Sequence, residues 1–160
     1  MKLRPIAGTS LAATASAALG SVGTDPESWY YRTLRKPHWQ PPALAFPVVW
    51  TALYADIGIA TGVGLGELQE SDRTDEARRL AVALGANLAL NTLWSWLFFR
   101  WHRRTLATLE CAILAASSAD LVRRVGAVNR KAGIALAPYP VWCAFATVLS
   151  GTIARLNRGR

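Results

Sequence analysis

Residues 80–99 read LAVALGANLALNTLWSWLFF and decide the fold of this chain. The stretch contains no charged residue, and a helix of this length, at about 1.5 Å per residue, spans the roughly 30 Å hydrocarbon core of a bilayer. Residues 5–24 and 132–154 are also free of charge and at least as long. These three runs predict three transmembrane helices.

Two further apolar segments each contain a carboxylate. Residues 43–66 contain Asp56, and residues 105–121 contain Glu110, with Asp120 near the end. Transmembrane helices tolerate such groups when the groups face the bundle interior or find a partner. We therefore predict an all-α membrane protein, a single five-transmembrane-helix bundle over residues 1–160. Its helices are expected at about 5–24, 43–66, 80–99, 105–122 and 132–155.

The charged residues cluster where this bundle needs its ends and connections. Nearly every Lys and Arg falls within residues 2–4, 32–36, 73–79, 100–104, 123–131 and 155–160. A soluble bundle of very apolar helices is the alternative, and this clustering argues against it. The net charge of +8 could suggest nucleic acid, but no nucleic-acid motif is present, so we expect the cations to meet lipid phosphates.

Charge does not orient the bundle, because its two sides carry nine Lys and Arg residues each. The first span has an alternative of its own. Residues 1–20 have a basic start and Ala-x-Ala patterns that are typical of a cleaved signal peptide. The charge-free run exceeds a usual signal core, so we favour a retained helix.

Reactive side chains are few. Cys111 and Cys143 lie in predicted spans, where a small thiol packs well, so no disulfide follows. Both histidines are isolated in predicted loops, which indicates no metal site. Glu110 and Asp120 are ten residues apart on one helix and cannot converge. We predict no cofactor, no catalytic residues and no conventional enzyme.

Prolines shape two places in the chain. Pro37, Pro41 and Pro42 fix the backbone and remove donors, so residues 25–42 are expected to form a stiff, non-helical lid loop before the second helix. Pro138 and Pro140 fall inside the fifth helix, which we expect to be kinked. Such a kink often widens a central cavity.

The lid loop also carries cations beside an aromatic ring. Arg32, Arg35 and Lys36 precede Trp39. This combination suits a flat anionic ligand or lipid headgroups. The sequence leaves both readings open.

Several polar and aromatic side chains share helix faces. Asn87, Asn91 and Trp94 lie on one face of the third helix, and the two amides should point inward, to bond another helix or a ligand. Trp50 and Trp142 lie deeper than interfacial anchors, which leaves core packing and ligand contact open.

Asp56 lies on the other side of the second helix from Tyr54. We expect it to be neutral, or paired with an arginine of another helix or of another copy of the chain.

Small residues recur every four positions on two predicted helices. They are Gly58, Gly62 and Gly66 on the second, and Ala81, Gly85 and Ala89 on the third. Small side chains let membrane helices approach closely, either within the bundle or between copies. We predict a homodimer through the stripe on the third helix.

Four ordered motifs resemble a known family. They are LRKPHWQPP at 34–42, VWTALYADIG at 49–58, NLALNTLWSWLFF at 87–99 and PYPVWCAFATVLS at 138–150. The chain resembles the translocator protein family, also called tryptophan-rich sensory proteins or peripheral-type benzodiazepine receptors. The resemblance implies a five-helix, often dimeric bundle with a porphyrin pocket. It also implies an N-terminus outside and a first loop and C-terminus in the cytoplasm.

The resemblance also carries a ligand-binding set onto this sequence. It comprises Trp39, Trp50, Tyr54, Asn87, Asn91, Trp142 and Ala146. Two departures stand out. Tyr30 and Tyr31 occupy the places of a Trp-Tyr pair in the loop, with Trp29 displaced by one residue, which weakens the case for porphyrin stacking there. Ser150 and Gly151 replace an Asn and a Tyr, which leaves sterol binding in doubt.

The leading hypothesis is a membrane tetrapyrrole-binding protein that acts as a sensor, regulator or transporter. Its porphyrin would stack on Trp50 and Trp142, with propionates facing Arg32, Arg35 or Lys36. Two alternatives are slow oxidative or light-dependent porphyrin breakdown, and service as an accessory subunit of another membrane protein.

Overall fold

The structure, a computed structural model, describes residues 3–159. These residues form seven α-helices and one turn of π-helix, and they contain no β-strand. The helices are α1 (Leu3–Gly23), α2 (Trp29–Thr33), α3 (Ala45–Glu70), α4 (Thr74–Ser95), α5 (Arg104–Val128), α6 (Arg130–Leu136) and α7 (Pro138–Leu156), with the π-helical turn η1 (Trp96–Arg100) after α4.

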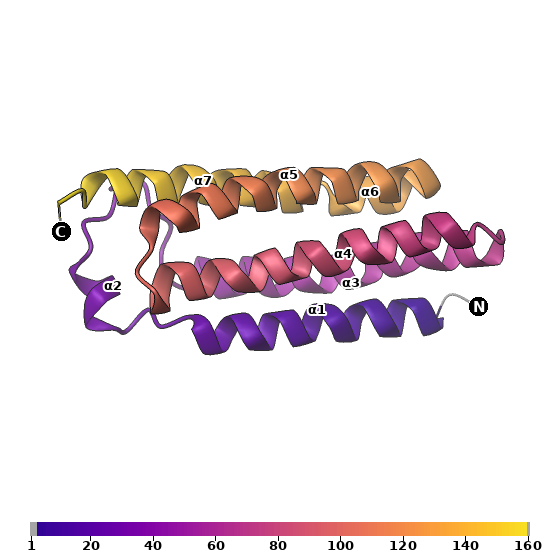
Figure 1. The fold of residues 1–160 in the computed structure, drawn as a ribbon, viewed down its shortest axis with the longest axis horizontal. Helices are drawn as coiled ribbons and strands as arrows, with labels where there is room; N and C mark the ends of the chain where they lie inside the picture. The colour runs from indigo at the N-terminus through magenta and orange to yellow at the C-terminus, as the bar shows by residue number, and fades with distance from the viewer. Residues whose placement is uncertain (1–2, 160) are drawn as a thin grey trace.

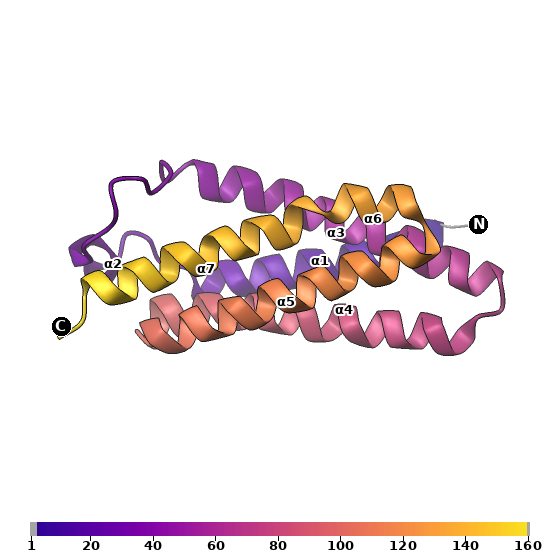
Figure 2. The same cartoon turned by 90° about the horizontal axis from the view of Figure 1, so that it is seen from above.

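Five long segments lie side by side in an elongated bundle (Figures 1 and 2). They are α1, α3, α4 with η1, α5, and α6 with α7, and each is long and apolar enough to cross a membrane. Large apolar side chains cover the outer surface, among them Leu11 at 71% exposure and Val141 at 69%. Lipid accommodates such a surface, whereas water would not. The predicted all-α membrane bundle is confirmed.

The bundle brings the loops and the chain ends to defined places. Helix α1 packs chiefly on α3 and α4, and α5 packs on α4, α6 and α7. The lid loop with α2, the connection from η1 to α5, and the end of α7 lie at one end of the bundle, opposite the start of α1 (Figure 1). This end is called the lid end below.

Residues 67–79 interleave five acids with three arginines, a pattern that predicts a solvated loop, and the structure differs from this prediction. Helix α3 continues to Glu70 and α4 begins at Thr74, so only residues 71–73 connect them. Charged residues on solvated helical turns form local pairs that support the helix, as Arg73 does with Glu76 at 2.6 Å. Asp72 closes the turn with a positive φ of 54°.

The predicted kink in the fifth span is a break between two helices. Helix α6 ends at Leu136 and α7 begins at Pro138, which occupies a first-turn position where a missing N–H costs nothing. Figure 2 shows the resulting bend between α6 and α7. The proline-rich lid loop also contains one short helix, α2, whose start Ser28 caps by accepting from the Tyr31 N–H at 3.3 Å.

The two small-residue stripes have different surroundings: the first packs on α1, and the second lies on the bundle surface. A Cβ at Gly58 would lie 2.7 Å from the Cα of Ser10, and one at Gly62 would lie 2.5 Å from the Cα of Ile6. The first stripe is therefore an internal contact with α1. Ala81, Gly85 and Ala89 are exposed on the bundle surface, and a Cβ at Gly85 would meet nothing within 4 Å.

Candidate ligand cavity

A cavity of about 530 Å³ opens between the helices toward the lid end. This volume is within the range of small-molecule sites, roughly 300–1,000 Å³. Its walls come from α1, α3, α4 with η1, α5 and α7, and residues of the lid loop cover it. The lining includes Gly20, Tyr31, Gln40, Phe46, Trp50, Tyr54, Asn91, Trp94, Ser95, Phe98, Cys111, Leu114, Trp142, Cys143, Ala146 and Ser150.

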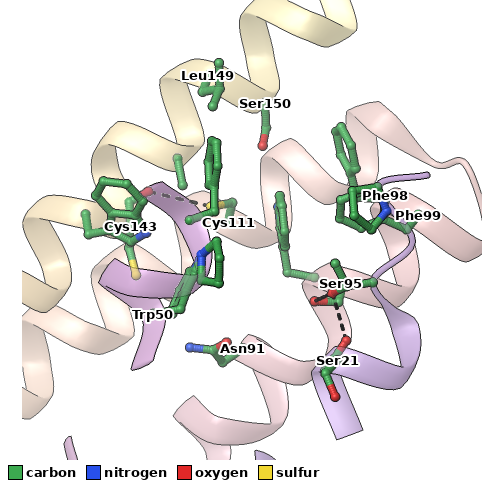
Figure 3. Close-up of a pocket in the computed structure, with 18 of the residues that line it drawn as sticks. Ser21, Trp50, Asn91, Ser95, Phe98, Phe99, Cys111, Cys143, Leu149 and Ser150 are labelled. Carbon is green, nitrogen blue, oxygen red and sulfur yellow. Dashed lines mark hydrogen bonds between the residues drawn. The ribbon is translucent and has the colours of Figure 1, made fainter. Parts of the chain in front are cut away.

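Aromatic rings form most of the wall. Trp50 packs against Tyr54 with ring centroids 5.7 Å apart, on α3. Trp142 on α7 lies 6.0 Å from Phe46. Trp94 on α4 stacks on the next lining ring, Phe98, at 5.3 Å and an interplanar angle of 16°. Figure 3 shows side chains from several helices converging on this space. Such walls favour a large, flat, apolar ligand.

A continuous chain of hydrogen bonds runs behind the aromatic wall. The Tyr54 hydroxyl donates to Asn91 Oδ1 at 2.8 Å, and Asn91 Nδ2 donates to the Tyr139 hydroxyl at 2.8 Å. The Tyr139 hydroxyl donates to Asn87 Oδ1 at 2.8 Å, and Asn87 Nδ2 donates to Ser118 Oγ at 3.2 Å. The chain links α3, α4, α7 and α5. Satisfied networks of this kind rigidify a buried site.

Hydrogen bonds within the lid loop converge on Tyr31. Lys36 Nζ donates to the Tyr31 carbonyl at 2.7 Å and lies 4.2 Å from the Tyr31 ring centroid. Gln40 Nε2 donates to the Tyr31 hydroxyl at 3.3 Å. Burial raises the pKa of the Tyr31 hydroxyl, and this effect outweighs the opposite effect of the Gln40 hydrogen bond. Burial also lowers the pKa of the Lys36 ammonium.

Asn157, just after α7, fastens the lid loop to the C-terminal end of the chain. Its Oδ1 accepts from the Arg35 backbone N–H at 3.0 Å, and its Nδ2 donates to the Arg35 carbonyl at 2.9 Å. The same Nδ2 donates to the Ile153 carbonyl at 2.8 Å. Asn157 is only 1% exposed. These two bonds to the backbone of Arg35 are called the Asn157 clamp below.

The structure brings most of the sequence-predicted ligand set to the cavity. Trp50, Tyr54, Asn91, Trp142 and Ala146 line it.

The other predicted residues lie outside the lining. Asn87 is fully buried in the hydrogen-bond chain, and Trp39 packs edge to face on Phe145 at 6.1 Å and is 39% exposed. Arg32, Arg35 and Lys36 belong to the lid loop and do not line the cavity.

Sequence reasoning missed the contribution of α5. Cys111 and Leu114 line the cavity, and Ser118 follows at the same face. Their spacing of three, then four, places them on one helix face and is the signal in the sequence that could have found them. The two thiols point to different partners, since Cys111 Sγ donates to the Cys143 carbonyl at 3.6 Å while Cys143 Sγ lies 3.7 Å from Ser118 Oγ.

Two acidic groups inside the spans stand apart from the network. Glu110 is 6% exposed, and neither of its carboxyl oxygens has a hydrogen-bond partner among residues 3–159. Asp56 is half-buried on α3 and makes no hydrogen bond or ion pair within the same residues, so the arginine partner considered for it is absent there. The described chain contains no cluster of His, Cys, Asp or Glu that could hold a metal ion.

Comparisons with known proteins cover nearly the whole chain. The model of the TspO/MBR family matches residues 8–156. The chain is 34% identical to the tryptophan-rich protein TspO of Chlorobaculum tepidum, over 88% of this chain and 89% of that protein. It is 33% identical to protein CrtK of Rhodobacter capsulatus, over 91% and 89% of the two chains. It is 30% identical to the translocator protein of Homo sapiens, over 97% and 91%.

Proposed function

Because this chain belongs to the TspO/MBR family of membrane proteins, we propose that it binds a tetrapyrrole in the aromatic cavity and acts as a sensor, regulator or transporter of that ligand. The observation that carries the proposal is the cavity itself. Its wall presents the rings of Trp50 and Trp142 and only a few polar groups, among them Asn91. A porphyrin offers the matching chemistry, a flat apolar macrocycle with polar substituents at its rim.

The charge at the lid end supports an anionic ligand. The described segments at this end, which are residues 24–44, 96–104 and 153–159, carry eight cations and two acids. The cations are Arg32, Arg35, Lys36, Arg100, Arg103, Arg104, Arg155 and Arg158, and the acids are Asp25 and Glu27. Such a field attracts carboxylates toward the cavity mouth. In this proposal the propionates of the porphyrin contact Arg32, Arg35 or Lys36 as the lid loop moves.

Two further features belong to the same proposal. The exposed stripe of Ala81, Gly85 and Ala89 serves as the contact between two copies of the chain, because only small side chains stand between its backbone and a neighbouring helix. The lid end faces the cytoplasm, with the N-terminus outside. Accessible-cysteine labelling of single-cysteine variants at the two ends tests this orientation.

Porphyrin titration tests the proposed ligand. Protoporphyrin is added to the purified protein in detergent, and tryptophan fluorescence is followed in the wild type and in a variant with Trp50→Phe and Trp142→Phe. Because other tryptophans remain as reporters, saturable quenching is measurable in both proteins. We expect the double variant to lose several-fold in affinity, because each Phe keeps a ring that can stack but offers a smaller surface than indole; removing a stacking ring altogether costs about 1–3 kcal/mol.

A matched control separates the cavity from nonspecific association. Trp29→Phe alters a ring that is 81% exposed and outside the cavity lining, so it should leave the affinity unchanged. Equal affinity in the wild type and the double variant would show that porphyrin does not use this site. Absorption spectra of the same samples report on breakdown, because a new linear-tetrapyrrole band would replace the porphyrin bands.

A further inference from the structure

A second hollow lies between α4 and α5, at the end of the bundle opposite the lid end (Figure 1). It has a volume of about 690 Å³ and shares no lining residue with the aromatic cavity. Its lining consists of Asp75, Arg78, Arg79, Val82, Ala83 and Ala86 on α4, and Ser117, Asp120 and Arg124 on α5. This hollow is called the α4–α5 groove below.

Two helix faces meet at the groove. The lining residues on each helix follow one another at spacings of three or four, which places each set on a single face. Asn87 Nδ2 on α4 donates to Ser117 Oγ on α5 at 3.1 Å and joins the two faces at the deep end of the groove. Arg79 lies eight residues from Asn87, and Arg124 lies seven residues from Ser117. The two arginines are therefore at about the same depth on facing helices.

Three arginines bring unbonded N–H donors to this groove. Arg78 and Arg79 make no hydrogen bond or ion pair among residues 3–159, although Asp75 lies one helical turn before both. Arg124 donates from Nε to Asp120 Oδ2 at 2.5 Å, and its two terminal nitrogens make no hydrogen bond within the same residues. Guanidinium groups with free N–H donors suit the oxygens of a phosphate, which accept several charge-assisted hydrogen bonds at once.

The α4 side of the groove changes from charged to apolar along the helix. Its charged residues end at Arg79, where the charge-free run 80–99 begins, and the lining continues with Val82, Ala83 and Ala86. Val82 is 65% exposed, so this part of the groove belongs to the outer surface that lipid covers. The lining as a whole holds three arginines and two aspartates, which leaves a surplus of one positive charge. This order of charge and apolar surface matches the headgroup and acyl chain of a phospholipid.

We propose that the α4–α5 groove binds one anionic phospholipid by the phosphodiester of its headgroup. The phosphate oxygens accept from Arg78, Arg79 and Arg124, and an acyl chain lies along Val82 and Ala86. The single negative charge of the phosphodiester cancels the surplus positive charge of the groove. A free phosphate would meet the same arginines but would leave the apolar half uncovered, so the bilayer is the source of this ligand.

Two lipids with matched chains test this site in the full-length protein. Dioleoylphosphatidylglycerol and dioleoylphosphatidylcholine share their acyl chains and their phosphodiester, and only the first has a net negative charge. Native mass spectrometry of the protein released from a non-ionic detergent counts the bound lipids and gives both affinities. The wild type should bind one phosphatidylglycerol roughly tenfold more tightly than phosphatidylcholine, because the quaternary ammonium of the second lipid is repelled by the arginines.

A pair of charge variants separates the groove from general attraction to a basic protein. Arg78→Gln with Arg79→Gln removes two donors from the groove and should bring the two lipid affinities within about twofold of each other. Arg130→Gln with Lys131→Gln is the matched control, because it removes two exposed cations at the same end of the bundle, on α6 and outside the groove. This control lowers the net charge equally and should keep the preference. Thermal unfolding confirms that both variants are folded.

A steric variant tests the apolar half of the groove without changing any charge. Ala86→Trp places a large ring at an exposed lining position, so phosphatidylglycerol should bind several-fold more weakly because its acyl chain loses its place. Ala112→Trp is the control, since it puts the same ring at an exposed position of α5 outside the groove. An unchanged affinity in folded Ala86→Trp would show that the lipid does not lie along this surface.

Four further outcomes would overturn the lipid site. Two are equal affinity of the wild type for the two lipids and an equal loss of preference in the control that lacks Arg130 and Lys131. The third is displacement of the lipid by soluble glycerol 3-phosphate, which would mean that the groove takes a free phosphate. The fourth is a lipid bound to the monomer and absent from the dimer, which would mean that a second copy of the chain covers the groove. Porphyrin binding enters none of these measurements.

Discussion

The Tyr54 hydroxyl donates to Asn91 Oδ1 across 2.8 Å and so joins α3 to α4 in the cavity wall. Trp50 stands one helical turn from Tyr54 and packs on its ring. The orientation of this pair of rings in the cavity wall is therefore tied to an amide on a neighbouring helix. Ligand binding and bundle stability share these side chains.

Removing the Tyr54 hydroxyl should destabilise the bundle. In Tyr54→Phe the Oδ1 of Asn91 loses its donor and becomes an unpaired acceptor, while Asn91 Nδ2 still donates to the Tyr139 hydroxyl. We expect a loss of about 1 kcal/mol in the free energy of unfolding, measured by thermal or denaturant unfolding in detergent. Tyr30→Phe is the control, because the buried Tyr30 hydroxyl has no partner among the described residues. A loss as large in Tyr30→Phe would contradict the assignment.

Contact between α1 and α3 should not tolerate a methyl group at Gly62. The added Cβ would lie 2.5 Å from the Ile6 Cα, which is backbone and cannot move aside cheaply. Gly62→Ala should therefore cost about 1–3 kcal/mol of stability in the same unfolding assay. Gly85→Ala makes the same change where nothing lies within 4 Å, and it should be neutral or stabilising because Ala is the better helix former. Equal effects of the two substitutions would argue against this packing.

Opening the Asn157 clamp should loosen the lid loop. Asn157→Ala removes both bonds to the Arg35 backbone, so the Arg35 amide should exchange hydrogen with solvent faster, and porphyrin should dissociate faster. Asn157→Asp retains the acceptor for the Arg35 N–H and should have a smaller effect on exchange at that amide. Hydrogen exchange of the lid peptide, read by mass spectrometry, measures the effect in both variants. Unchanged exchange in Asn157→Ala would exclude a role for the clamp.

A bulky residue in the exposed small-residue stripe should separate the proposed dimer. Gly85→Leu fills space that is empty within one copy, so it leaves the fold intact but blocks close approach of a second α4. Light scattering with detergent correction should show a monomer for Gly85→Leu and a dimer for the wild type. Val82→Leu is the control, because it places the same leucine side chain at another exposed position on the same helix. A dimer that survives Gly85→Leu would place the contact elsewhere.

Apolar run length was enough to predict the five spans, because a bilayer imposes one length on every crossing helix. Charge was a poorer guide to helix ends. The acids and arginines of residues 67–79 suggest a loop, yet most of them lie on helical turns at the end of α3 and the start of α4. Polar side chains on such turns are solvated, so composition alone does not separate a loop from a solvated helix end.

The sequence predicted those cavity residues whose spacing along a helix and whose family motif both indicated an inward-facing side chain. Trp50, Tyr54, Asn91 and Trp142 were found from spacing and motif, and they line the cavity. The sequence predicts Glu110 only as a tolerated carboxylate, because it cannot reveal whether a buried group has a partner. Whether a partner is present depends on how α5 packs against its neighbours in three dimensions.

The Asn157 clamp makes the last turn of the chain a working part of the entrance to the cavity. Movement of the lid loop away from the bundle at Arg35 breaks the two hydrogen bonds to Asn157, so in the proposed mode of binding the opening of the lid is coupled to the residues that follow α7. In the same proposal, a force on residues after α7 weakens the Asn157 clamp and so loosens the lid loop over the cavity. Affinity tags for this protein belong at the other end of the chain.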